Sequence, residues 1–240
     1  MASDPRPILI VLHQATSTPG RVGQKLVAAG APLDIRRPAL GDTLPQSTRD
    51  HRGVVVFGGP MSANDPEPFI ADEIALIERT LRDDTRFLGI CLGAQMLARA
   101  IGGHVAPHAD GQVEMGYYEI APTVSGRALM EWPQKVYQWH REGFYLPKGT
   151  DLLATGQHYD QAFRVGTNAY GIQFHPEVTL AMLHRWTTRA HERLTLPGAR
   201  QRGDHFRGRA LYDPPFAAWL DAFMALWLSD APAAQEASAA

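Results

Sequence analysis

The sequence predicts an α/β fold built on a mixed, mostly parallel sheet. Two runs, Ile8–Leu12 and Gly53–Phe57, are almost wholly apolar, as central parallel strands are because both of their faces are buried. Segments with apolar residues at helical spacing follow these runs, which is the alternation expected of a parallel sheet with crossover helices. Residues 105–164 are instead rich in β-forming residues and turns, so we expect antiparallel strands at one side of the sheet.

The first half of the chain is expected to alternate strands and helices. In chain order the predicted elements are a strand at Ile8–Leu12, a helix at Arg21–Ala29, strands at Leu33–Ile35 and Gly53–Phe57, a helix at Phe69–Leu81, a strand at Phe87–Ile90 and a helix that ends before Gly102. The helix at Phe69–Leu81 is amphipathic, because its isoleucines recur on one face.

The second half is expected to hold short strands followed by two helices. Strands are predicted at 116–120, 135–140, 152–155, 161–164 and 170–174, and helices at Leu180–Leu194 and from Asp213 to Leu228. Pro214 and Pro215 suit the first turn of the last helix, where an N–H group has no helical partner to lose. This helix is apolar around nearly its whole circumference, so it either fills the space between the sheet and the preceding helix or forms a homodimer interface.

Length and composition fit one domain. A chain of 240 residues with 45% hydrophobic residues can bury a large core, and no linker divides it, so residues 1–230 are expected to form a single domain. The alanine-rich stretch 231–240 is expected to be a disordered tail.

Charge and cysteine content exclude several classes of function. The net charge of −2 provides no basic field for nucleic acid or an anionic membrane. The most apolar segment, Phe216–Leu228, is well short of the roughly 20 residues that span a bilayer. A single cysteine permits no internal disulfide, and the first residues lack the apolar core of a signal peptide. We therefore expect a cytoplasmic protein with no nucleic-acid or membrane partner.

Cys91 lies where the strand at Phe87–Ile90 must become a helix. It is flanked at two residues' distance by Gly89 and Gly93, a pattern typical of a nucleophile elbow, in which small neighbours allow a sharp turn. At the N-terminus of a helix the thiolate is favoured over the thiol. The alternative is a small buried cysteine with no chemical role.

His175 and Glu177 follow a β-type run and are separated by Pro176. The proline cannot continue a strand, so His175 is expected at the strand's exit, with Glu177 able to bend back towards one imidazole nitrogen. A nucleophilic cysteine needs an adjacent base and that base needs an orienting group, so the three residues together predict a Cys-His-Glu triad. Taken singly, His175 is more often a core histidine and Glu177 an ordinary helix acid.

These motifs carry a resemblance to a known family. The segment from Gly89 to Gln95, His175-Pro-Glu177 and the preceding stretch from Val55 to Ser62 resemble the class I, triad-type, glutamine amidotransferases, and most of all stand-alone members similar to the glutaminase domain of GMP synthase. The resemblance runs from about Ile8 to Leu228. It implies a three-layer, doubly wound, flavodoxin-like fold and a catalytic triad of Cys91, His175 and Glu177.

The resemblance also implies further site residues. It assigns the backbone amides of Gly59 and Leu92 to an oxyanion hole, although Gly58-Gly59-Pro60 by itself is also an ordinary turn. It assigns contacts with glutamine to Gln95, Trp139 and Arg141. Glu114 and Gly116 match a family signature.

Cofactors and metals are not expected. No GxGxxG or P-loop sequence follows a predicted strand, so nucleotide binding has no support. The histidine pairs His104/His108 and His184/His191 lack the carboxylates or thiolates of a tight metal site. His13, at the carboxyl end of the first strand, either lines the pocket or has a structural role.

The implied activity is hydrolysis of the γ-carboxamide of glutamine through a γ-glutamyl thioester. The ammonia would pass to a separate synthetase subunit. The alternative is a stand-alone γ-glutamyl peptidase that acts on γ-glutamyl peptides or amines, and a third reading is a non-catalytic regulatory module.

An arginine-rich segment follows His175. Arg185, Arg189 and Arg193 lie on one face of a predicted helix at intervals of four. Arg200, Arg202, Arg207 and Arg209 are expected in the loop beyond it. Such a run is either a solvated face or a surface that docks an acidic partner.

Overall fold

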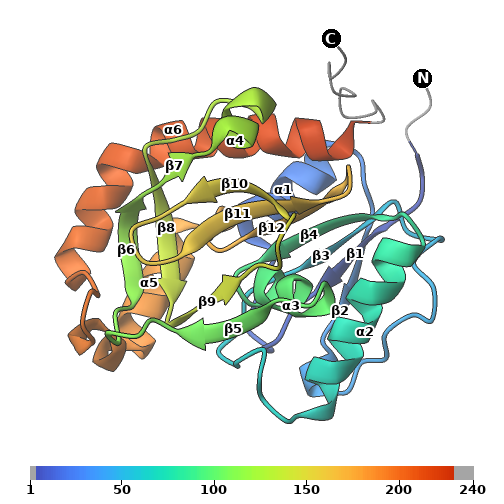
Figure 1. The fold of residues 1–240 in the computed structure, drawn as a ribbon, viewed down its shortest axis with the longest axis horizontal. Helices are drawn as coiled ribbons and strands as arrows, with labels where there is room; N and C mark the ends of the chain where they lie inside the picture. Colours follow the sequence, from blue (N-terminus) through green and yellow to red (C-terminus); the bar gives the residue numbers. More distant parts are fainter. Residues whose placement is uncertain (1–3, 230–240) are drawn as a thin grey trace.

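A computed structural model describes residues 4–229 of the chain, so the tail predicted at 231–240 lies outside the described residues. Within the described part, one sheet has eight strands in the order β2-β1-β3-β4-β12-β11-β10-β7 (Figure 1). Their bounds are β1 Ile8–Val11, β2 Leu33–Arg36, β3 Gly53–Val56, β4 Arg86–Ile90, β7 Ala121–Pro122, β10 Asp151–Thr155, β11 Asp160–Val165 and β12 Ala169–Ile172. The first five strands in this order pair in parallel and the last three pair antiparallel, which confirms the mixed, mostly parallel sheet.

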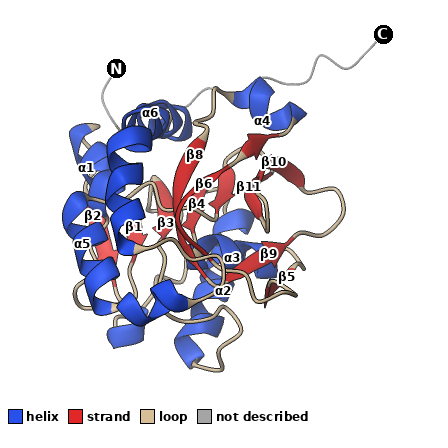
Figure 2. Cartoon of the chain, turned by 90° about the vertical axis from the view of Figure 1, so that its left-hand side faces the viewer, coloured by secondary structure: helices blue, strands red, loops and turns tan. Residues whose placement is uncertain are grey.

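Helices cover both faces of this sheet. They are α1 Gly20–Ala28, α2 Pro68–Arg82, α3 Leu92–Ala100, α4 Val124–Leu129, α5 Leu180–Arg189 and α6 Arg202–Leu228, with 3₁₀ turns at Pro38–Leu40 and His191–Thr195. Successive strand residues point to opposite faces. Ile8 and Ile10 therefore pack with α1, α5 and α6, whereas Leu9 and Val11 pack with α2 and α3. The result is the expected three-layer arrangement (Figure 2).

Two short antiparallel ribbons lie beside the main sheet. One pairs β5 (His104–Pro107) with β9 (Glu142–Tyr145), and the other pairs β6 (Glu114–Glu119) with β8 (Lys135–His140). The strands predicted at 116–120 and 135–140 thus pair with each other, while those predicted at 152–155 and 161–164 join the main sheet as β10 and β11. The β6–β8 ribbon reaches the loop after β12, because the His175 N–H donates to the Tyr137 carbonyl over 2.8 Å.

Both C-terminal helices differ from their predicted bounds. The helix predicted at Leu180–Leu194 ends at Arg189, and Ala190 (φ −118°, ψ 39°) leads into a 3₁₀ turn. The last helix was expected from Asp213 but begins at Arg202, so Arg202, Arg207 and Arg209 are helical and not in a loop. Figure 1 shows α6 changing direction between its orange and red parts.

The prolines that suggested a helix start lie inside α6. Pro214 and Pro215 have no N–H, so the carbonyls of Ala210 and Leu211, four residues earlier, have no helical donor. All four residues are exposed. Water can satisfy carbonyls at such positions, so the helix bends at the prolines and continues.

The apolar residues of the second half of α6 are buried within the chain. Phe216, Trp219, Leu220 and Phe223 belong to the core between α6, α1 and the sheet. Packing within the chain therefore accounts for most of the apolar surface of this helix. A homodimer interface stays a prediction. Across residues 4–229, no helix combines the length and the apolarity needed to cross a membrane.

Candidate active site

The site lies at the carboxyl ends of three neighbouring parallel strands. Strand β4 lies between β3 and β12, so the segments that follow these strands meet at one edge of the sheet. Those segments carry Gly58, Cys91 and His175. The order of the strands thus brings Gly58 next to His175, although the two residues lie 117 positions apart in the sequence.

Cys91 has the strained backbone of a nucleophile elbow. It is the residue before α3 and has φ 51° and ψ −104°, a conformation uncommon outside glycine. Gly89 and Gly93 make the turn sterically possible. A Cβ on Gly93 would lie 2.1 Å from the Val56 carbonyl oxygen, and one on Gly89 would lie 2.5 Å from the Gly93 carbonyl carbon. The cysteine is 5% exposed at the N-terminus of the helix.

His175 lies between Glu177 and Cys91. Its Nδ1 is 2.7 Å from Glu177 Oε1, and both side chains are buried. His175 and Cys91 also lie close to each other, because both border Gly58. A Cβ added to Gly58 would lie 2.8 Å from His175 Cε1 and 3.4 Å from Cys91 Cβ. Because Nδ1 is engaged by the carboxylate, Nε2 is the nitrogen left for the sulfur.

The charges around His175 favour its protonated form. Burial by itself lowers the pKa of His175, but the Glu177 carboxylate and Cys91 act in the opposite direction and raise it to about 10. An imidazolium at neutral pH stabilises negative charge on the neighbouring sulfur. This pairing is the usual way in which a protein activates a cysteine.

The loop that carries Pro176 and Glu177 is held from two helices. Arg21 of α1 donates from Nε to the Pro176 carbonyl over 3.0 Å, and its backbone N–H donates to the Glu177 carbonyl over 2.9 Å. Arg21 and Arg209 of α6 both pair with Asp213, at 2.9 and 3.3 Å. Sequence reasoning missed this clamp, because no local pattern relates residue 21 to residue 176.

The predicted oxyanion-hole residues lie next to each other. A Cβ on Gly59 would be 3.0 Å from both Leu92 Cδ2 and His13 Cγ. Leu92 is the first residue of α3, so its N–H has no partner within the helix.

His13 lies behind this loop and does not line the cavity. Its Nδ1 is 3.1 Å from the Gly58 carbonyl oxygen, and its Nε2 is 2.9 Å from Oε2 of Glu73, which is fully buried. A carbonyl oxygen can only accept, so Nδ1 is the donor in the bond to Gly58. Of the two roles open to His13, the structure supports the structural one.

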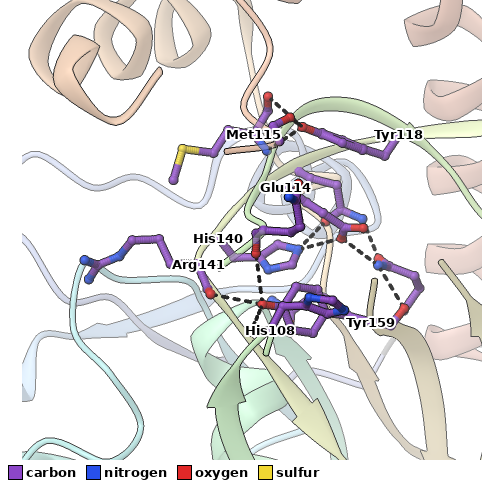
Figure 3. Close-up of polar contacts among 12 residues, drawn as sticks. His108, Glu114, Met115, Tyr118, His140, Arg141 and Tyr159 are labelled. Atoms are coloured by element: carbon purple, nitrogen blue, oxygen red, sulfur yellow. Dashed lines mark hydrogen bonds and ion pairs between the residues drawn. The ribbon is translucent and has the colours of Figure 1, made fainter. Parts of the chain in front are cut away.

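A buried polar network supports the turn between β8 and β9 (Figure 3). Glu114 Oε2 lies 3.1 Å from His140 Nε2 and accepts from Gln161 Nε2 over 2.9 Å. The Tyr159 hydroxyl lies 3.1 Å from the Arg141 carbonyl oxygen. Glu114 and Tyr159 thus hold the loop whose residues were expected to contact glutamine.

The three predicted glutamine contacts have different positions. Trp139 lines the cavity beside His175, and its ring packs 5.8 Å from that of Trp186. The Arg141 side chain is exposed. Gln95 is 4% exposed and donates to the Glu142 carbonyl over 2.8 Å, so it supports the turn between β8 and β9 from α3.

A cavity of about 340 Å³ opens beside these residues. Its walls are the segment after β1, the Gly58-Gly59-Pro60 turn, His175 with Glu177, and one face of α5 with the turn that follows. This last wall carries Arg185, Arg189 and Arg193. Sequence reasoning identified the arginine stripe but not that it faces the site. Among residues 4–229, no group of three or more His, Cys, Asp or Glu side chains could hold a metal ion.

Comparison with known protein families identifies the family of this chain. The family described as "Glutamine amidotransferase class-I" matches residues 20–186, which include all three sequence motifs of the site.

Known relatives include proteins much longer than this chain and one of similar length. GMP synthases (glutamine-hydrolysing) from Bacillus velezensis and Porphyromonas gingivalis are 31% and 35% identical over 53% and 56% of this chain, but the match spans only 24% and 26% of those proteins. A glutamine amidotransferase-like protein of Salmonella typhimurium, YfeJ, is 28% identical over 71% of this chain and 75% of its own length.

Solved structures extend the similarity to nearly the whole chain. A glutamine amidotransferase from Methylobacillus flagellatus superposes with a TM-score of 0.87 at 26% identity, covering 94% of this chain and 95% of that one. One from Thermotoga maritima has a TM-score of 0.76 at 28% identity, covering 92% and 95%.

Proposed function

This chain belongs to the class I glutamine amidotransferase family, and on that premise we propose that it hydrolyses the γ-carboxamide of glutamine, through a thioester on Cys91, to glutamate and ammonia. The observation that carries the proposal is the meeting of Cys91 with the His175–Glu177 pair at one edge of the sheet. Sulfur, imidazole and carboxylate then stand in the order that nucleophilic amide hydrolysis requires.

The proposed reaction has two halves. The Cys91 thiolate attacks the γ-carbonyl carbon, and the Gly59 and Leu92 N–H groups stabilise the oxyanion. His175, oriented by Glu177, protonates the nitrogen as the C–N bond breaks, and ammonia leaves. The neutral imidazole then takes a proton from water, whose oxygen attacks the thioester and releases glutamate.

The proposed use of the ammonia is by a separate synthetase subunit in the cytoplasm. The relatives that are named GMP synthases are much longer than the region they share with this chain.

Replacing the nucleophile tests the proposal. Cys91→Ala should lower glutamine hydrolysis by roughly 10⁴-fold or more, because the covalent route is lost, while the melting temperature stays close to that of the wild type. Hydrolysis is measured as glutamate released. A glutamine-derived chloroketone should add one label to the wild type, on the peptide with the only cysteine. Comparable turnover in Cys91→Ala would exclude the mechanism.

A second candidate is hydrolysis of other γ-glutamyl amides. One observation favours it, namely the arginines that line the cavity beside His175. Ammonia, the group that leaves from glutamine, is too small to need several arginines for its binding.

A further inference from the structure

Three arginines form one wall of the cavity beside the candidate triad. Arg185 and Arg189 lie one turn apart on α5, and Arg193 follows in the 3₁₀ turn; we call these residues the arginine wall. Arg185 and Arg193 are partly buried and Arg189 is exposed. The same cavity is lined by His175 and by the Gly58–Pro60 turn, so the arginine wall and His175 border one space.

The other arginines of this region are engaged locally. Arg200 and Arg202 lie over the rings of Tyr118 and Phe206, each 4.9 Å from the ring centre, while Arg207 pairs with Asp204 and Arg209 with Asp213. A solvated or structural role accounts for all four. It does not account for the arginine wall.

The positive charge of the arginine wall is not neutralised within the described chain. Arg185 donates to the Thr16 carbonyl over 2.9 Å, and none of the three guanidinium groups forms an ion pair with a residue in 4–229. The cavity has two acidic residues: Glu177, which is committed to His175, and the exposed Glu192. Burial and the neighbouring charge of Arg141 lower the pKa of Arg193, and the Glu192 carboxylate acts in the opposite direction. Three arginines along one cavity wall make that wall positively charged, which favours the binding of an anion in the cavity.

The chemistry of the site places a specific part of the substrate there. His175 must protonate the leaving nitrogen, so that nitrogen lies next to the imidazole. Any substituent on it extends into the cavity that the imidazole lines, towards the arginine wall. A space of about 340 Å³ is within the range of small-molecule pockets and can take more than a primary amide.

We propose that the arginine wall is a subsite for carboxylate groups on the leaving amine, so that the site also accepts γ-glutamyl derivatives of amino acids and other acidic amines and prefers them over uncharged γ-glutamyl amines. This inference rests on the proposed thioester chemistry and names its substrate class. Cys91 forms the thioester, the C–N bond breaks, and His175 donates the proton with which the amino acid leaves. One water then restores the enzyme, so γ-glutamyl-X and water become glutamate and X.

Matched chromogenic substrates test the charge preference. γ-Glutamyl-4-nitroanilide and γ-glutamyl-3-carboxy-4-nitroanilide differ by one carboxylate on the leaving group. The wild type should prefer the carboxylated substrate in kcat/KM by about tenfold or more, the scale of one charge-assisted hydrogen bond. In Arg185→Gln/Arg189→Gln this ratio should fall towards one. Arg207→Gln, which removes an exposed arginine of α6, should keep the wild-type ratio.

A binding measurement separates this proposal from the catalytic one. With Cys91→Ser, calorimetry should show γ-glutamylglutamate binding about tenfold more tightly than γ-glutamylmethylamide, and the difference should disappear when Arg185→Gln/Arg189→Gln is added. This readout needs no turnover, so it stands even if hydrolysis of glutamine fails. Equal affinities, or an unchanged kcat/KM ratio in the arginine variant, would overturn the subsite while leaving glutamine hydrolysis intact. That result would instead favour a docking surface for an acidic protein.

Discussion

At the scale of single residues, the site depends on buried charges that compensate each other. His175 is paired with Glu177 on one side and faces Cys91 on the other, so the cost of burying each charge is offset by its neighbours. A second buried pair, His13 with Glu73, lies behind the Gly58–Gly59 turn.

The raised pKa of His175 predicts where activity is lost at high pH. In the proposed reaction the protonated imidazole is the acid that the leaving nitrogen needs, and it persists until pH rises through the pKa of about 10. In Glu177→Gln the carboxylate that raises the pKa is absent, so the proton is lost at lower pH and the alkaline limb of kcat/KM should move towards neutrality. Hydrolysis of glutamine between pH 6 and 11 measures this shift.

The control for this profile is Glu192→Gln. It removes a carboxylate from the same cavity without touching His175, so the alkaline limb should keep its position. Profiles that coincide for the wild type and Glu177→Gln would show that His175 is not the group that titrates.

His13 is expected to position the oxyanion hole without contacting substrate. In a trans peptide the C=O and the following N–H point in opposite directions, so the bond from His13 to the Gly58 carbonyl directs the Gly59 N–H away from His13. His13→Leu should therefore lower kcat by roughly ten- to a hundredfold with little change in KM, since a lost oxyanion donor costs about 10²–10³. Steady-state kinetics with glutamine measure both constants.

The conservative variant distinguishes positioning from simple destabilisation. His13→Asn keeps an N–H near the place of Nδ1 and should recover much of kcat. Both variants are made with Glu73→Gln, so that no buried carboxylate is left without a partner. Equal kcat values for the Asn and Leu variants would contradict the positioning role.

At the scale of elements, helices far apart in the chain fix the loop that carries Glu177. Arg21 comes from the start of α1, and Arg209 and Asp213 come from the first half of α6. This explains why α6 extends back to Arg202: the part before the prolines reaches the site, and the part after them packs on the sheet. One helix thus connects the core to the loop that carries Glu177.

The second half of α6 should carry much of the stability of the protein. Phe223 is 1% exposed, stacks on Trp219 at 4.9 Å and meets the edge of Tyr170. Phe223→Ala should lower the free energy of unfolding by about 3–5 kcal/mol through lost burial and a cavity. Leu211, in the same helix, is 66% exposed, so Leu211→Ala should change it by less than about 0.5 kcal/mol. Denaturant unfolding compares the two, and similar losses would refute the packing described for α6.

At the scale of the whole molecule, the parallel sheet separates two cores and leaves its carboxyl edge for chemistry. The chain carries a net charge of only −2, yet three arginines gather at the mouth of the site. A local field of this kind attracts anions without making the whole surface basic. The proposed substrate preference follows from this local excess of positive charge and not from the net charge of the chain.

Local patterns in the sequence predicted most of the elements and the turn from strand to helix at Cys91. Apolar runs, helical periodicity and the two glycines around Cys91 act over a few residues, so they can be read without knowing the fold. The predicted start of α6 was wrong because it too depended on a local pattern. Two consecutive prolines favour a first turn locally, and the tertiary packing that lets a helix bend through them is not visible in the sequence.

By itself the sequence determined the α/β class, the mixed sheet, the family resemblance and the residues proposed as the triad. Only the tertiary structure decided that His13 holds Gly58, that Arg21 clamps the loop before Glu177, and that the arginines of α5 face the cavity. Each of these contacts joins segments brought together by strand order and helix packing. Such contacts leave no periodic or local trace, because what selects them is the shape of the folded chain.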